Sequence, residues 1–133
     1  MSKRALISVV VIFVLSMAFG YLVHELLLGP EYAALAGLFR PKPEQMSHFP
    51  FMLLAHVFIA VGFVWIYLKG KEDKPFLGQG IRFGIAVAVL TTIPTYLIYY
   101  AVQAMPGLLV LKQIVFDAVA VVLMGIVVAW LNR

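Results

Sequence analysis

Residues 106–131 read PGLLVLKQIVFDAVAVVLMGIVVAWL, an apolar run whose only charged or amide side chains are Lys112, Gln113 and Asp117. An α-helix needs about 20 such residues to cross about 30 Å of hydrocarbon. Three further apolar runs of similar length occupy residues 5–28, 49–68 and 78–104. A backbone in lipid must satisfy its hydrogen bonds internally, and these runs lack strict alternation, so the sequence predicts helices and not a barrel.

The composition agrees with a membrane protein. Of the 133 residues, 64% are hydrophobic and 12% are charged, whereas a soluble domain has about 25% charged residues and at most about 50% apolar ones. We therefore expect an all-α fold, an integral membrane four-helix bundle that forms a single transmembrane domain over residues 1–133. The expected partners are the lipid bilayer and either further copies of the chain or a larger membrane complex. No basic patch with interleaved aromatics indicates nucleic-acid binding.

The basic residues predict the orientation. Six of them flank one set of helix ends and two flank the other: Lys3, Arg4, Lys69, Lys71, Lys74 and Arg133 against Arg40 and Lys42. Positive side chains are retained on the cytoplasmic side, so both termini are expected inside.

The first apolar run also has features of a signal peptide. Two basic residues precede it, and Ser16-Met17-Ala18, with small residues at its first and third positions, resembles a cleavage site. The run continues to Val23, however, which is longer than a typical signal-peptide core and long enough to span. We expect it to be retained as a membrane helix.

The connection between the first two runs, residues 29–48, contains a helical pattern. Pro30 and Glu31 suit a helix start, and apolar residues follow at helical spacing until Arg40-Pro41-Lys42-Pro43 stops the helix. The sequence predicts a short helix over residues 31–39 that lies on the outer membrane surface, with a lid over a site as its functional alternative.

Small residues predict how the helices associate. In lipid, apolar side chains gain nothing by leaving the hydrocarbon for one another, so close packing through small residues has to contribute. The third run has such residues every four positions: Gly80, Gly84, Ala88 and Thr92. This stripe is expected to contact another helix, and Pro94 is expected to kink the same helix.

Four polar groups fall in the outer half of the predicted bundle: His24, His56, Lys112 and Asp117. A charge near the membrane centre costs at least ~2.5 kcal/mol, so such groups face the bundle and find partners. We expect Asp117 to be buried, to contact Gln113 and threonine or tyrosine groups of the third helix, and to carry its proton at neutral pH. Lys112 points about 140° away from Asp117 on the same helix and is not expected to pair with it.

Three functions are compatible with these groups. The first, which we expect, is a structural, accessory or interaction protein without a cofactor, in which they only bond helices together; the other two are alternatives. The second is binding of haem b through His24 and His56, or of a divalent metal ion through these two with Glu25 and His48. The third is proton-coupled transport, with Asp117 as the proton carrier and with Thr92, Thr95 and Tyr96 along a path.

Catalysis is the least favoured function. His24-Glu25 begins the H-E-x-x-H pattern of zinc hydrolases, but Leu28 stands where the second histidine is needed. No phosphate-binding loop or nucleophile elbow is present. We therefore expect that the protein is not an enzyme.

The whole chain resembles a group of small proteins. The pattern G-Y-x-x-H-E-x-x-L-G-P-x-Y over residues 20–32, the F-R-P sequence at 39–41 and the G-x-x-x-G at 80–84 are similar to those of small four-helix bacterial inner-membrane proteins grouped as uncharacterised domains of unknown function. The resemblance implies architecture and a multi-pass inner-membrane location. It implies no activity.

Overall fold

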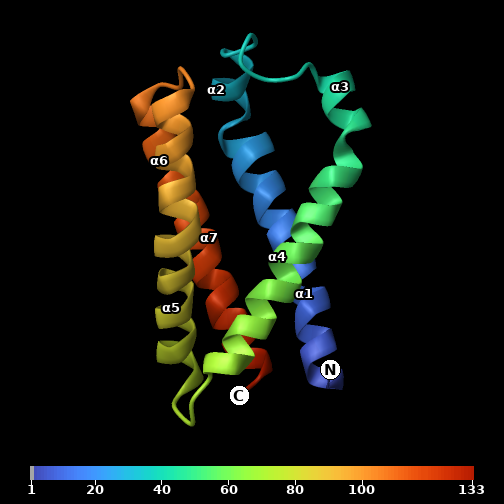
Figure 1. Cartoon of the computed structure of the whole chain (residues 1–133), viewed down its shortest axis with the longest axis vertical. Helices are drawn as coiled ribbons and strands as arrows, with labels where there is room; N and C mark the ends of the chain where they lie inside the picture. Colours follow the sequence, from blue (N-terminus) through green and yellow to red (C-terminus); the bar gives the residue numbers. More distant parts are fainter. Residues whose placement is uncertain (1) are drawn as a thin grey trace.

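The computed structural model describes residues 2–133, which form helices joined by turns, with no strand among them (Figure 1). In chain order the elements are α1 (Lys3–Tyr21), the π-helical η1 (Leu22–Leu27), α2 (Gly29–Ala33), α3 (Lys42–Ser47), α4 (Phe49–Gly70), α5 (Phe76–Val87), the π-helical η2 (Ala88–Thr92), α6 (Ile93–Val102) and α7 (Gly107–Leu131). Four continuous helices are long and apolar enough to cross a membrane: Lys3–Leu27, Phe49–Gly70, Phe76–Val102 and Gly107–Leu131. The all-helical chain with four helices of spanning length is thus confirmed.

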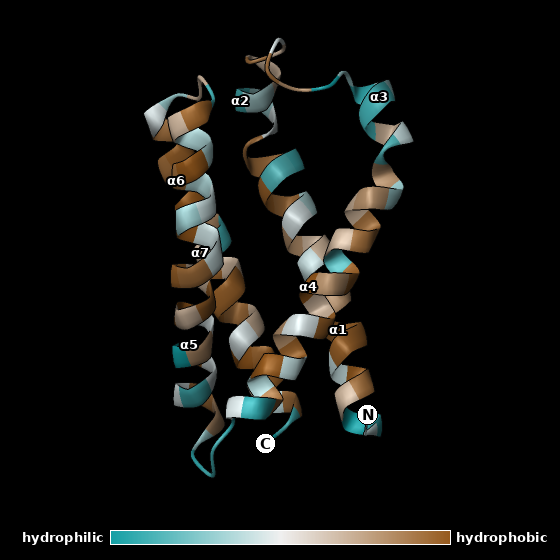
Figure 2. Cartoon of the chain, in the orientation of Figure 1, coloured by the Kyte–Doolittle hydropathy of each residue, from teal (hydrophilic) through white to brown (hydrophobic). Residues whose placement is uncertain are grey.

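The two ends of the molecule differ in the elements that they carry. The N- and C-terminal ends of the chain lie at one end, which we call the terminal end, and α2 and α3 lie at the other, which we call the α2–α3 end (Figure 1). Hydrophilic residues gather at both ends, and the helices between them are largely apolar (Figure 2). This distribution fits helices whose middle parts lie in hydrocarbon.

The closest helix pair is α5 with α7. Both Gly80 and Gly84 are buried, and a methyl group added at Gly84 would lie 2.5 Å from the Cα atom of Val122 on α7. A methyl group at Gly80 would lie 2.7 Å from the carbonyl oxygen of Gly125. The two backbones therefore touch directly, because no side chain separates them. Ala88 and Thr92, the other members of the stripe, are also buried.

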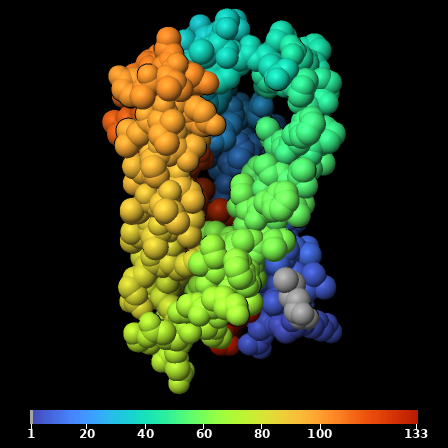
Figure 3. All heavy atoms as spheres, viewed as in Figure 1, coloured from blue at the N-terminus to red at the C-terminus, as the bar shows by residue number. Residues whose placement is uncertain are grey.

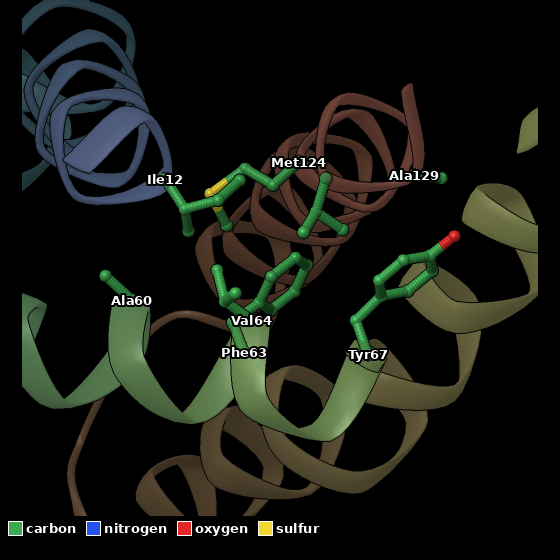
Figure 4. Packing of buried hydrophobic residues seen from close by; sticks show 8 residues of the cluster. Ile12, Ala60, Phe63, Val64, Tyr67, Met124 and Ala129 are labelled. Atoms are coloured by element: carbon green, nitrogen blue, oxygen red, sulfur yellow. The ribbon is translucent and has the colours of Figure 1, made fainter. Parts of the chain in front are cut away.

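A hydrophobic core joins α1, α4 and α7 towards the terminal end (Figure 4). Its buried members are Ile12, Ala60, Phe63, Val64, Tyr67, Met124, Val128 and Ala129. From this core α4 diverges towards the α2–α3 end, where Phe51 and Phe58 on it are both 70% exposed. The space-filling view shows a hollow between α4 and the α5–α6 helix (Figure 3).

The third spanning helix is irregular where its sequence contains proline. Residues Ala88–Thr92 form a π-helical turn in which the Ile93 N–H donates to the carbonyl of Ala88, five residues back. Pro94 follows at the start of α6 and has no N–H to donate. The Thr91 hydroxyl donates to the carbonyl of Val87 at 2.7 Å. The sequence predicted a kink at Pro94, and the structure has a π turn over the residues just before it.

The connection between the first two spanning helices differs from the helix expected over residues 31–39. The helix α2 ends at Ala33, and residues 34–38 continue as turns, with the Leu38 N–H donating to the carbonyl of Leu35. A second helix, α3, begins at Lys42 and was not expected. The prolines here end one segment and start the next, because a proline is well tolerated in the first turn of a helix.

Candidate functional site

A cavity of about 480 Å³ lies between α1, α4, the third spanning helix and α7. Its lining is largely apolar and includes Phe19, Phe63 and Met124. The polar members of the lining are Ser16, His24, His56, Thr91, Thr92 and Asp117. The hollow in Figure 3 is the opening of this space between α4 and the α5–α6 helix. Small-molecule sites have volumes of about 300–1,000 Å³ with a few convergent polar groups, so this cavity has the size and lining of a ligand site.

The polar centre of the cavity is a cluster of three side chains. The Nε2 atom of His24 lies 3.1 Å from Oδ2 of Asp117. The hydroxyl of Tyr96 donates a hydrogen bond to the same Oδ2 atom. The side chains of His24 and Asp117 remain 33% and 20% exposed. Among the described residues the other carboxylate oxygen, Oδ1, has no hydrogen-bond partner, so it is available to a ligand.

The backbone brings His24 and Asp117 together from distant parts of the chain. Asp117 lies ten residues after Gly107, the first residue of α7, which is about 15 Å along the helix. His24 lies in the π-helical turn η1, in which the Leu28 N–H donates to the carbonyl of Val23 at 2.9 Å. The wider π turn holds an extra residue, which rotates the residues after it by about 100° relative to a regular helix.

A second set of hydrogen bonds closes the cluster on the α2–α3 side. The hydroxyl of Tyr32 on α2 lies 2.7 Å from Nδ1 of His24, and the two rings stack with centroids 5.8 Å apart. Nε2 of Gln113 donates to the same hydroxyl at 3.0 Å. Burial raises the pKa of Tyr32 above its ordinary value, so its hydroxyl keeps its proton at neutral pH and can donate to His24.

Two ion pairs hold the connecting segment against the spanning helices. Nζ of Lys112 on α7 lies 2.6 Å from Oε1 of Glu31 on α2, and Nζ of Lys42 lies 2.9 Å from Oε2 of Glu25. Both pairs are partly exposed, so each contributes at most about 1 kcal/mol. Lys112 therefore pairs with the connecting segment and not with Asp117, in agreement with its direction on α7.

The partners expected for Asp117 are only partly correct. The hydrogen bond from Tyr96 agrees with a tyrosine contact from the third helix. The contact with Gln113 is wrong, because that amide bonds Tyr32 instead. His24 was missed as the partner, although the sequence places both groups in the outer half of the bundle. The side chain of Asp117 is half-buried, because it forms part of the cavity lining.

Neither haem nor metal ligation is favoured by the positions of the four residues considered for it. Both ring nitrogens of His24 already have partners, in Tyr32 and Asp117. Nδ1 of His56 lies 2.8 Å from the Ser16 hydroxyl, and Glu25 pairs with Lys42. His48 bonds its own segment through the carbonyl of Glu44. Within residues 2–133 no group of three or more His, Cys, Asp or Glu side chains could hold a metal ion.

The residues expected along a transport path do not all reach the cavity. Thr92 is buried and lines it, and Tyr96 bonds Asp117. Thr95 is exposed and is not part of the lining. The cavity is lined by residues of α1, α4 and α7 as well as by residues of the third helix.

The protein is thus a helical bundle with four helices long and apolar enough to cross a membrane, and with a half-buried His–Asp–Tyr cluster facing a cavity among them. Comparison of the chain with protein-family models, with curated proteins and with solved structures found no match.

Proposed function

We propose that the protein binds a cationic amphiphile in this cavity and exchanges it for a proton held by His24 and Asp117. A cationic amphiphile is here a molecule with a large apolar part and one positive charge. The observation that carries the proposal is the position of the His24–Asp117 pair, which borders a largely apolar cavity of about 480 Å³. Intramembrane ionisable groups that face a cavity are typical of substrate or proton sites.

Charge balance couples binding of the cation to release of the proton. The pair is electrically neutral when the imidazole and the carboxylate share one exchangeable proton. A bound cation would raise the net charge to +1 in a medium where a charge costs at least ~2.5 kcal/mol. Release of the proton restores neutrality, with the cation beside the carboxylate oxygen Oδ1 of Asp117. Binding is therefore expected to strengthen with rising pH, by up to about tenfold per pH unit.

The hydrogen bonds of Tyr32 and Gln113 can adjust to both protonation states of His24. With a neutral imidazole, the Tyr32 hydroxyl donates to Nδ1 and accepts from Nε2 of Gln113. With an imidazolium, Nδ1–H donates to Tyr32, and the hydroxyl then needs an acceptor. Oε1 of Gln113 is buried and has no partner among the described residues, and rotation of the amide by half a turn supplies it.

The test is equilibrium dialysis of ethidium against the purified protein in lipid nanodiscs, with empty nanodiscs subtracted. The parent protein is expected to bind ethidium more tightly as the pH rises and to release about one proton per bound cation, measured with a pH indicator. Asp117→Asn removes the carboxylate and should weaken binding at least about tenfold, because each factor of ten corresponds to only about 1.4 kcal/mol.

Asp73→Asn is the matched control, since Asp73 is an exposed carboxylate in the turn between α4 and α5. This variant should bind ethidium like the parent. Equal ethidium affinity of Asp117→Asn and the parent, or binding without proton release, would show the proposal to be wrong.

The proposed setting is the inner membrane of a bacterium, with both termini in the cytoplasm and α2 lying at the outer surface over the cavity. The bias of six basic residues against two supports this orientation. A fluorescent protein fused after Arg133 should fluoresce in cells, and alkaline phosphatase inserted at Gly37 should be active. The reverse pattern would contradict the orientation.

A structural or accessory role is the second candidate. The same cluster joins η1, α2, α6 and α7 through hydrogen bonds, and such bonds contribute about 0.6–2 kcal/mol each between membrane helices. If neither ethidium nor another lipophilic cation binds the parent protein, this role is favoured over exchange.

A further inference from the structure

We infer that His56 is a second recognition group in the same cavity, so that the ligand carries a hydrogen-bond donor, an amine N–H or a hydroxyl, besides its positive charge. This inference rests on the proposed function and specifies its substrate class. It depends on three observations: the direction of the His56 side chain, the hydrogen bonds of Ser16, and the free nitrogen of the imidazole.

His56 is half-buried on a helix segment, residues 49–59, whose other residues are exposed. The outer part of α4, FPFMLLAHVFI over residues 49–59, has no other polar side chain. Its neighbours Phe51 and Phe58 are 70% exposed. His56 instead contacts α1, where its Nδ1 lies 2.8 Å from the Ser16 hydroxyl, and it lines the cavity.

Ser16 fixes which nitrogen of His56 carries the proton. The Ser16 hydroxyl has one hydrogen, which it donates to the carbonyl of Phe13 at 2.9 Å. Its oxygen is then an acceptor for His56, so Nδ1 carries the hydrogen and donates it. This arrangement satisfies all three groups, and it leaves Nε2 of the neutral imidazole as an acceptor.

Nε2 of His56 has no hydrogen-bond partner within residues 2–133. A methyl group added at Gly20 of α1 would lie 3.9 Å from this nitrogen, in ordinary contact. The cavity therefore presents two acceptors, Oδ1 of Asp117 and Nε2 of His56, in an otherwise apolar space. A ligand with one cationic group and one further donor satisfies both, whereas a purely apolar cation leaves Nε2 unpaired.

The experiment compares two cations of the same shape. Ethidium carries aromatic amino groups, and 5-ethyl-6-phenylphenanthridinium is the same cation without them. In equilibrium dialysis with nanodiscs, the parent protein is expected to bind ethidium about five- to tenfold more tightly than the analogue, after correction for partition into empty nanodiscs. In His56→Leu the two affinities should agree within about twofold, and the analogue should bind as it does to the parent.

His56→Phe is the second variant, because it keeps a ring at the site without nitrogen atoms. Binding of the analogue shows that the cavity of a variant is intact. The two cations are then compared in the variant that still binds the analogue. A preference for ethidium that persists in that variant overturns the inference. Failure of the proposed function looks different, because Asp117→Asn would then leave the binding of both cations unchanged.

Discussion

Gly84→Ala is expected to destabilise the bundle by at least about 2 kcal/mol, more than most single methyl additions. The added Cβ atom would lie 2.5 Å from Cα of Val122 and 3.1 Å from the carbonyl oxygen of Val121, so it meets backbone and not a movable side chain. Relief requires α5 and α7 to separate, and this separation also weakens the contacts of Gly80 with Gly125. The measurement is the free energy of unfolding from a titration with SDS, followed by circular dichroism.

Gly62→Ala is the control, because a methyl group at Gly62 on α4 would meet no atom within 4 Å. It should leave the free energy of unfolding unchanged or raise it by up to about 1 kcal/mol, because alanine favours a helix over glycine. A Gly84→Ala protein as stable as the control would mean that α5 and α7 do not pack in this way.

Asp117→Leu is expected to cost about 1–3 kcal/mol of folding free energy, whereas Asp117→Asn should stay within about 1 kcal/mol of the parent. Leucine leaves Nε2 of His24 and the hydroxyl of Tyr96 without their common acceptor. Asparagine keeps an oxygen that can accept one of these bonds. The same SDS titration measures both variants.

A double-mutant cycle isolates the bond to Tyr96. In Tyr96→Phe the hydroxyl is already absent, so Asp117→Leu should cost less in that background than in the parent, by about 0.6–2 kcal/mol. Equal costs in the two backgrounds would show that the Tyr96–Asp117 bond does not stabilise the fold.

The sequence predicted correctly the properties that depend on a single helix. Span length follows from the number of apolar residues needed to cross the hydrocarbon, and the four helices found have that length. The small-residue spacing of Gly80 and Gly84 requires no knowledge of the partner, because any helix that reaches this stripe meets exposed backbone. Direction on a helix was equally readable for Lys112, which pairs with Glu31 and not with Asp117.

The sequence did not predict correctly the helix boundaries in the short connecting segment. Apolar residues at helical spacing over 31–39 suggested one helix, but α2 ends at Ala33. A segment this short gains little from helix formation alone, so its conformation follows its contacts. Those contacts are the ion pair of Glu31 with Lys112 and the bonds of Tyr32 to His24 and Gln113.

The sequence by itself determined that the chain forms four apolar helices of spanning length and which face of the third helix is smooth, since both depend on properties of single segments. Only the tertiary structure decided that His24 meets Asp117, 93 positions along the chain, while Gln113 meets Tyr32. The physical reason is that helix tilt and π turns set the depth and rotation of each polar side chain. Both are fixed by packing between helices, and so is the divergence of α4 that leaves the cavity open.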